Sequence, residues 1–296
     1  MAWRTLHIGQ PSRLSIKHNQ LVIQQDEPVV VPLEDVGCIV LDTPQVTLTG
    51  AVLSACARHQ IALIQSDETH HPAFMGLSFW GHYRQAYILA HQLAATLPFK
   101  KQLWQHIVRQ KLTNQQLVLQ ACVKKTTVLP QLIKQVKPGD PENIEARGAR
   151  LYWATLWDNF RRQDESDIRN ALLNYGYAIL RASLSRALVG AGLLPALGIH
   201  HVSMTNTFNL SDDLIEPFRP MVDHQVYTIV MHGGCETMTL GHRQQLTQIL
   251  GHKVLFQGEA LEIMGAIERT VDGLVRAYQE KNTKHLQLPL WIPQDE

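Results

Sequence analysis

The chain has 296 residues, a length that fits one large domain or two modest ones. Hydrophobic residues make up 45% of it, its formal net charge is +1, and it has no run of eighteen apolar residues, so its composition excludes a membrane span and fits an ordinary globular protein. The first twenty residues lack the apolar core and small-residue cleavage site of a signal peptide, and we therefore expect a cytoplasmic protein.

Positive charge is concentrated in the middle of the chain. Residues 1–75 carry four Lys/Arg and seven Asp/Glu, whereas residues 81–190 carry sixteen and seven, a net charge of +9. Such an excess is expected of a surface that binds a polyanion. Solvated helix faces are the alternative.

The first 75 residues are predicted to form β structure. Short runs of Val, Ile and Leu, as in RLSIKHNQLVIQ and VVVPLEDVGCIVLD, are separated by turn residues. Residues 48–60 have the apolar spacing of a helix packed on this sheet, and IALIQSD is expected to form a further strand. Residues 68–75, ETHHPAFM, are expected to form an exit loop with solvated histidines.

From Trp80 onward the sequence is predicted to be helical, because apolar residues recur at spacings of three and four. A small hairpin, HKVLFQGEALEI, is expected inside this part. Residues 285–296 contain two prolines and no period, so we expect a tail that is disordered or docks on a partner. The predicted class is α+β, with a small β-rich N-terminal domain at residues 1–75 and a larger all-α C-terminal domain at residues 76–284.

The four cysteines form no CxxC pair and lie in apolar or glycine-rich surroundings. We expect buried free thiols and no disulfide framework. Cys235 as a nucleophile with His232 as its base is a weaker hypothesis, because both lie on one glycine-rich turn and no residue that orients the histidine is apparent.

A strong helix-start signature follows residues 135–139. Asp140 is expected to be the N-cap, followed by a proline and an acidic first turn, so that Glu145 lies about one turn into the helix. The small neighbours of Glu145, Gly148 among them, would let another element or a nucleic-acid backbone approach closely. An ordinary surface glutamate is the alternative.

The stretch GIHHVSM places His200 and His201 on a connection between helices. Ser211 is expected to cap a new helix, with Asp213 in its first turn, where the helix dipole favours a negative charge. Glu216 has no such local explanation. It lies three residues after Asp213 on the same helix face, directly before a proline.

A histidine and a glutamate fifteen residues apart form no general metal signature. With Glu145 as a third ligand, one imidazole and two carboxylates would suit Mn²⁺ or Mg²⁺ better than a thiolate-preferring metal. Such an ion could stabilise charge on a phosphoryl oxygen and orient an attacking hydroxyl.

The absence of several sequence motifs argues against the enzyme classes that carry them. The chain has no GxxxxGK[ST] loop, no HExxH helix and no GxSxG elbow. The aromatic stripe that includes Tyr152, Trp153, Trp157 and Phe160 is expected to serve as core and interface rather than as a base-stacking platform.

Three segments together resemble the CRISPR-associated integrases, the first of the numbered Cas proteins. They are NIEARGARLYW, NALLNYGYAILRASLSRALVGAGLLPALGIHH and FNLSDDLIEPFRPMVD, in the order and spacing of that family. The opening MAWRTLHI followed by LSIKHNQLVI looks like the form found in type II systems. The resemblance covers residues 1 to about 280.

This resemblance implies a metal-dependent DNA integrase and endonuclease of CRISPR adaptation. It implies joining of the 3′-hydroxyl ends of a captured protospacer duplex to the CRISPR repeat by transesterification, in a helical catalytic domain. It also implies a homodimer through the β-rich domain, with two dimers flanking a dimer of a small ferredoxin-like companion Cas protein. The RNA-guided nuclease is a further expected partner, and no membrane partner is expected.

Carried over position by position, the metal-binding catalytic residues of the family correspond to Glu145, His201 and Glu216, with Mg²⁺ or Mn²⁺ as the implied cofactor. Asp213 matches an acidic position that can assist the site. Arg219 is expected to brace its helix through a salt bridge, and His200 to be a packed loop residue. Ala146 departs from the family, which usually has glycine there.

The basic middle segment supplies the expected phosphate contacts, which are Lys124, Lys125, Arg147, Arg150, Arg161 and Arg162. Their effect should depend little on DNA sequence and strongly on salt. Two alternatives stay open: a branched-DNA nuclease that does not integrate, and a non-catalytic DNA-binding scaffold.

Overall fold

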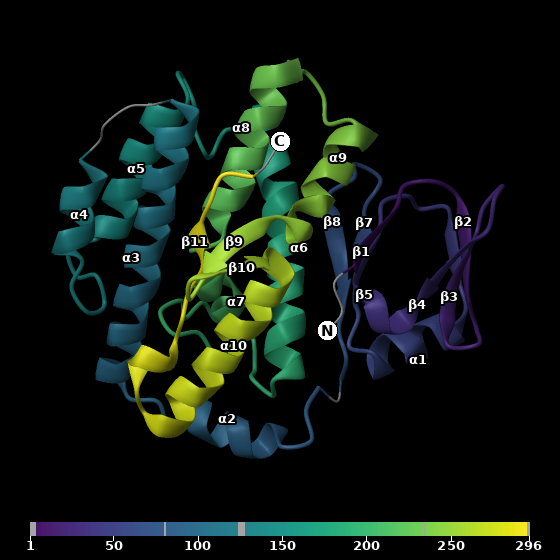
Figure 1. Cartoon of the computed structure of the whole chain (residues 1–296), viewed down its shortest axis with the longest axis horizontal. Helices are drawn as coiled ribbons and strands as arrows, with labels where there is room; N and C mark the ends of the chain where they lie inside the picture. Colours follow the sequence, from purple (N-terminus) through teal and green to yellow (C-terminus); the bar gives the residue numbers. More distant parts are fainter. Residues whose placement is uncertain (1–3, 80, 124–127, 234, 295–296) are drawn as a thin grey trace.

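Figure 1 shows the computed structural model of the chain, which describes residues 4–79, 81–123, 128–233 and 235–294. Strands dominate the N-terminal quarter and helices dominate the rest, which confirms the predicted α+β class. The long helix α6 (Ile168–Gly190) runs through the middle, between the N-terminal sheets on one side and helices α3 (Leu97–Cys122) and α5 (Ile144–Leu156) on the other. The division at residues 75 and 284 stays a prediction.

The N-terminal part contains two four-stranded sheets. The first has the order β1-β5-β7-β8, with β8 antiparallel to three parallel strands, and the second has the order β4-β3-β2-β6. Helix α1 (Gly50–Arg58) and the strands predicted in RLSIKHNQLVIQ, VVVPLEDVGCIVLD and IALIQSD are confirmed; these are β2 (Ser12–Lys17), β3 (Gln20–Gln24), β4 (Val29–Pro32), β5 (Val36–Leu41) and β7 (Ala62–Ser66). The structure adds β1 (Arg4–Ile8), β6 (Val46–Leu48) and β8 (Pro72–Gly76).

The exit loop expected at residues 68–75 is wrong in its second half, because strand β8 begins at Pro72 and pairs with β7. A tight turn precedes this strand, in which the Asp67 carboxylate accepts the backbone N–H groups of Thr69 and His71 at 2.9 Å each. Proline fits the first residue of an edge strand, because no partner strand needs its missing N–H.

Both faces of the inner strands of the first sheet, β5 and β7, are buried, each against a different core. Along β5, Ile39 and Leu41 join the small core between the sheets, whereas Cys38 and Val40 join the large helical core. This alternation is the two-residue period of a strand, and burial on both faces accounts for the continuous apolar run of β5. The first sheet therefore lies between the two cores and contributes side chains to both.

The remaining helices are α2 (Gln85–Leu93), α4 (Leu129–Gln135), α7 (Asn209–Leu214), α8 (Arg219–Gly233), α9 (Leu240–Thr247) and α10 (Ile263–Glu280), with short 3₁₀ turns η1 (Leu33–Asp35), η2 (Gln248–Gly251) and η3 (Thr283–His285). The predicted hairpin is confirmed as β9 (Lys253–Phe256) and β10 (Glu259–Glu262). Gln257 and Gly258 close it with positive φ angles, as a tight hairpin requires. None of the helices in the described residues is long and apolar enough to cross a membrane.

Helix α6 is the scaffold of the helical part. Helices α7, α8, α9 and α10 and strand β7 all pack against it, so it is buried on most sides. At Gly176 a Cβ atom would lie 2.5 Å from Val222 Cγ1, so glycine allows α8 to approach closely.

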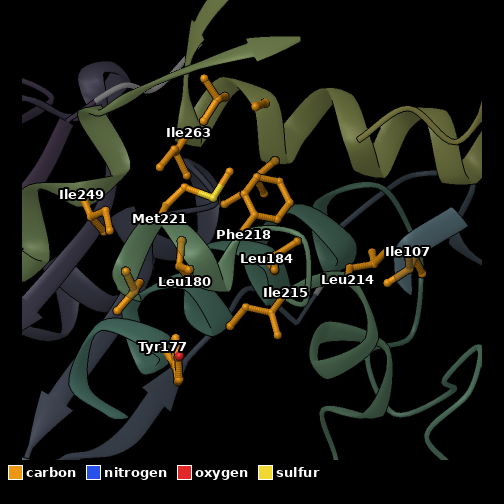
Figure 2. Packing of buried hydrophobic residues seen from close by; sticks show 14 of the residues in the cluster. Ile107, Tyr177, Leu180, Leu184, Leu214, Ile215, Phe218, Met221, Ile249 and Ile263 are labelled. Atoms are coloured by element: carbon orange, nitrogen blue, oxygen red, sulfur yellow. The ribbon is translucent and has the colours of Figure 1, made fainter. Parts of the chain in front are cut away.

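The turn between α7 and α8 is fixed by apolar packing. Figure 2 shows Ile215 and Phe218 in a cluster with Leu184 and Met221, and both are fully buried. Glu216 lies between these anchors in the sequence, so packing on both sides holds its backbone in place.

The C-terminal tail is ordered in its described residues, so the predicted disorder is wrong, whereas docking on a partner stays a prediction. Strand β11 (Leu290–Trp291) pairs antiparallel with β9, and Trp291 is buried. Asn114 of α3, wholly buried, accepts the N–H of Trp291 and donates to the carbonyl of Pro289, both at 3.0 Å. A two-residue strand between prolines has no periodicity, so its pairing depends on a distant partner.

Replacing Trp291 with alanine should lower the free energy of unfolding by about 3–5 kcal/mol, because it removes a large buried side chain from the helical core. The ring lies 5.0 Å from His224 of α8. Urea unfolding followed by circular dichroism measures the loss. Pro293→Ala, at an exposed site two residues on, is the control and should cost less than about 0.5 kcal/mol; equal stability of the two variants would contradict the packing role.

Candidate catalytic site

Three separate segments carry the predicted ligands to one region. Glu145 is the second residue of α5, His201 lies in the connection between α6 and α7, and Glu216 lies in the turn between α7 and α8. The ammonium group of Lys111, on α3, contacts both carboxylates. Helix α3 thus supplies a residue, Lys111, that links the two glutamates.

Helix α5 begins later than predicted. Its first residue is Ile144, because Asp140 and Asn143 take left-handed φ angles of 49° and 52° and form a turn before it. Asp140 still caps the helix from outside, since its carboxylate accepts the N–H groups of Ile144 and Glu145 at 2.9 Å each. Glu145 therefore lies in the first turn, where the helix dipole favours its negative charge.

Gly148, one turn later, lets α5 pack tightly on α3. A Cβ atom there would lie 2.3 Å from Leu112 Cδ2, so a larger residue would push the helices apart. The small residues after Glu145 thus allow α3 to approach closely. Close approach of another element was one of the two predicted possibilities, and approach of a nucleic-acid backbone was the other. The close crossing brings Lys111, which precedes Leu112, to Glu145.

Glu216 is a buried carboxylate held by two cations. Arg219 donates its Nε–H to Glu216 Oε1 at 2.9 Å, which confirms the predicted brace, and Lys111 Nζ lies 2.5 Å from Oε2. Burial alone would raise the pKa of Glu216, but the charges of Arg219 and Lys111 outweigh burial and lower it to about 2. The group is therefore ionised at neutral pH.

Asp213 organises the loop that carries His201 instead of lying in the first turn of α7, and its predicted role as an assisting acid stays a prediction. The carboxylate is fully buried and accepts the N–H groups of Ile199, His200 and His201 at 2.6, 3.0 and 3.1 Å. It also lies 2.7 Å from His201 Nδ1, and this hydrogen bond raises the pKa of His201, with Glu216 adding to the shift. Nε2 is then the ring nitrogen left for a ligand.

Ser211 does not cap α7, so that prediction is wrong as well. The helix begins at Asn209, and the Ser211 hydroxyl is buried 2.8 Å from the hydroxyl of Ser185 on α6. The next residue, Asp212, also pairs with α6, since Arg181 Nε lies 2.7 Å from its Oδ1. Helix α7 is thus fastened to α6 by polar contacts that local sequence does not reveal.

His200 is a packed residue, as predicted. One face of its ring stacks on Trp104, with centroids 4.2 Å apart and an interplanar angle of 1°, while the residue as a whole stays exposed; this partial burial lowers its pKa. Trp104 also meets the His201 ring edge-on at 5.8 Å. The two adjacent histidines therefore have different environments, and Trp104 supports both.

Sequence reasoning missed Lys111. Its side chain is only 8% exposed, and the pKa of its ammonium is raised because the attraction of Glu216 and Glu145 exceeds the effect of burial. A signal did exist: Lys111 continues the helical stripe of Ile107 and Val108, where an apolar residue is expected.

The donor set fits a hard divalent cation. Two carboxylates and the free imidazole nitrogen of His201 are available, and Glu216 Oε2 is buried without a hydrogen bond of good geometry despite its close contact with Lys111. In the part of the chain that the structure describes, no three His, Cys, Asp or Glu side chains lie close enough to hold one ion as they stand. The three-ligand set stays a prediction that requires the side chains to close around the ion.

A pocket of about 370 Å³ opens beside His201. Lys100 and Asn206 contribute polar groups to its wall, while Val202 and Met204 are 80% and 99% exposed and form an apolar rim. The imidazole can therefore be reached from outside, in contrast to the buried Glu216.

The predicted phosphate contacts differ in their surroundings. Those with exposed side chains are Arg147, Arg150 and Arg161. Arg162 instead donates to two asparagines of α6, at 3.1 and 2.6 Å, so its charge is partly engaged within the chain. Lys124 and Lys125 lie outside the described residues.

The hypothesis of a Cys235 nucleophile finds no support. His232 Nδ1 lies 2.9 Å from the Thr228 carbonyl, and the histidine near Cys235 is His242, at 3.5 Å. Burial raises the pKa of the Cys235 thiol, which disfavours the reactive thiolate. All four cysteines are free, as predicted, but only Cys38 and Cys56 are buried, so the predicted burial is wrong for Cys122 and Cys235.

The aromatic stripe that begins in α5 packs in the core, as predicted, and its part in an interface stays a prediction. Tyr152 and Trp157 are buried, Trp153 stacks on Trp157 with centroids 5.5 Å apart, and Phe160 packs on Trp157 at 4.9 Å. These contacts fix α5, and with it Glu145, against the helical core.

Comparison with known proteins agrees with the resemblance seen in the sequence. A family model described as CRISPR associated protein Cas1 matches residues 6–238. The CRISPR-associated endonuclease Cas1 of Neisseria meningitidis serogroup C (strain 8013) is 39% identical over 298 residues, which cover 99% of this chain and 98% of that protein.

Solved structures share the fold. A casposase bound to integration product superposes with a TM-score of 0.76 at 20% identity, covering 99% of this chain and 94% of that one. A chain of a Cas6-RT-Cas1–Cas2 complex gives a TM-score of 0.75 at 18% identity, covering 98% of this chain and 36% of that one.

Proposed function

Since this chain belongs to the CRISPR-associated Cas1 family, we propose that it is a metal-dependent DNA integrase and endonuclease of CRISPR adaptation. The observation that carries the proposal is the meeting of Glu145 and Glu216 at one buried positive charge, next to a histidine oriented by Asp213. The Neisseria relative is named an endonuclease, and the casposase is bound to an integration product, so both cutting and joining of DNA are proposed here.

Glu145, His201 and Glu216 would hold Mg²⁺ or Mn²⁺, which when bound stabilises negative charge on phosphoryl oxygens. Asp213 keeps His201 Nε2 free and fixes the ring, while Arg219 fixes one oxygen of Glu216. In the joining step, a 3′-hydroxyl oxygen of the captured duplex attacks a phosphorus of the repeat. A new P–O bond forms as the bond to the leaving 3′-oxygen breaks, and the proton passes overall to that oxygen.

The proposed substrate is double-stranded DNA, both as protospacer and as CRISPR repeat. The net charge of +9 over residues 81–190 supports this, because phosphate binding releases counterions. The proposed phosphate contacts are Arg147, Arg150, Arg161, Arg162, Lys124 and Lys125.

We propose a homodimer through the N-terminal sheets. Edge strand β4 exposes Val29 and Val30 (48% and 50%), and edge strand β8 exposes Phe74 (56%). Exposed apolar edge strands are surfaces that pairing with another chain would cover.

A four-plus-two assembly extends the proposal, with two such dimers flanking a dimer of the small ferredoxin-like protein Cas2. A Cas1–Cas2 complex among the structural neighbours supports this partner. The RNA-guided nuclease is proposed as a further partner.

The test combines the protein, its companion, a fluorescent duplex with free 3′-hydroxyls and a supercoiled plasmid bearing the repeat. Label should pass to the plasmid with Mg²⁺ or Mn²⁺ and not with EDTA. Glu145→Ala and His201→Ala should abolish transfer, whereas His200→Ala, which loses a stacking contact, should retain it.

Two other outcomes of this test would each support one of the two alternative functions. Cutting of branched DNA without transfer would indicate a nuclease that does not integrate. DNA binding that is unaffected by EDTA and by both substitutions, with neither cutting nor transfer, would indicate a scaffold.

A further inference from the structure

Lys111 contacts two of the three proposed metal ligands. The exposed fractions of the side chains are 8% for Lys111, 10% for Glu216 and 26% for Glu145, so the contact is mostly out of water. A buried lysine is stable only when it is paired, and here two carboxylates pair with it. The ammonium therefore competes for the same oxygens that a metal ion would use.

The cluster is electrically balanced before any metal ion enters. Glu145 and Glu216 carry two negative charges, and Lys111 and Arg219 carry two positive ones. The carboxylates around these four groups have other partners: Asp213 faces backbone N–H groups and the His201 ring, Asp212 pairs with Arg181, and Asp223 accepts a hydrogen bond from Tyr177. A divalent cation would thus enter a site without excess negative charge, and would be repelled by Lys111 at short range.

Packing prevents Lys111 from moving away. Ile107, Val108 and Leu112, on the same face of α3, are all completely buried, so the lysine stem rises from an apolar surface. Leu112 is also closely packed against Gly148 of α5. The buried stem therefore keeps the ammonium close to the two carboxylates.

We infer that Lys111 is a built-in counter-ion that weakens metal binding in the free protein and makes it depend on bound DNA. The inference rests on the proposed function, because it takes Glu145 and Glu216 as metal ligands. A DNA phosphate supplies the negative charge that the site lacks, so DNA and metal ion bind cooperatively. By linkage, DNA raises the metal affinity by the same factor as the metal raises the DNA affinity.

The test is Mn²⁺ binding, measured from the electron paramagnetic resonance signal of free Mn²⁺, with and without a short DNA duplex that lacks the repeat. In the wild type, DNA should raise the affinity for Mn²⁺ on the order of tenfold. In Lys111→Met, a neutral chain of similar length, Mn²⁺ should bind on the order of tenfold more tightly without DNA, and DNA should add less. Lys111→Arg retains the charge and should behave as the wild type.

The matched control is Lys137→Met, which removes an exposed lysine paired with Glu142 just before α5 and should leave Mn²⁺ binding unchanged. If Lys111→Met unfolds without metal, Mn²⁺ should restore its circular dichroism spectrum, and failure to do so would overturn the inference. Unchanged or weaker Mn²⁺ binding by a folded Lys111→Met, beside a wild type that binds, would overturn the counter-ion role and leave the metal site standing. Absence of Mn²⁺ binding in every protein, with and without DNA, would remove the proposed metal site and this inference together.

Discussion

Glu216→Gln should slow DNA joining by about a hundred- to a thousandfold, the cost of losing one strong electrostatic contact in a preorganised site. Glutamine has the shape of glutamate, so the packing of Ile215 and Phe218 on either side should survive. The neutral amide, however, cannot replace a charged ligand, and it leaves Lys111 and Arg219 with one carboxylate fewer. The single-turnover rate of label transfer at saturating Mn²⁺ measures the effect.

The control for this substitution is Glu142→Gln. Glu142 lies just before the same helix as Glu145 and pairs with Lys137 in solvent, so its loss should change the joining rate by less than about twofold. Thermal unfolding must show that both variants are folded. Joining by a folded Glu216→Gln at the wild-type rate would remove Glu216 from the ligand set.

Asp213→Ala should destabilise the protein by about 3–5 kcal/mol, because it deletes a buried charge that accepts hydrogen bonds from three backbone N–H groups and one imidazole. The three N–H groups would be left without their acceptor, and the loop from Ile199 to His201 would lose its shape. The unfolding midpoint should fall by about 5–8 °C. Joining should be lost as well, since His201 would no longer be oriented.

Asp212→Asn is the matched control in the adjacent position. Its ion pair with Arg181 lies nearer the surface, and the amide can still bond to Asn206, so the loss should be about 1 kcal/mol. Differential scanning calorimetry distinguishes the two variants. Equal midpoints for both would show that the Asp213 hydrogen bonds do not hold the loop.

The sequence predicted the elements that depend on local periodicity. Strands, helices and the hairpin closed by Gln257 and Gly258 follow from patterns within ten or twenty residues, and the structure confirms them. The start of α5 was misplaced because Asp140 caps it across four residues through its side chain. Strand β11 was missed because two residues carry no pattern, and its partner β9 lies far back in the chain.

In the candidate site, too, contacts between residues far apart in the sequence could not be predicted. Local reasoning assigned Asp213 to the helix dipole, but the groups that bond to it lie twelve to fourteen residues earlier in the chain. Lys111 could not be assigned a role at all, since it acts only where α3, α5 and the turn before α8 meet. Glu145, His201 and Glu216 came from family resemblance rather than from spacing, and as a ligand set they remain a prediction.

The doubly buried inner strands of the first sheet limit how such a protein can evolve. Arg243 of α9 donates to Asp42, at the end of β5, at 2.6 Å, and both side chains are almost fully buried. Consider a recombinant that takes its N-terminal strands from one ancestor and its helices from a divergent one. One of these two charges could then be buried without its partner, and the side chains that pack against each face of β5 would no longer fit together. The N-terminal part is therefore not an exchangeable module, and sequence changes on the inner face of its first sheet must be matched by changes in the helices that cover it.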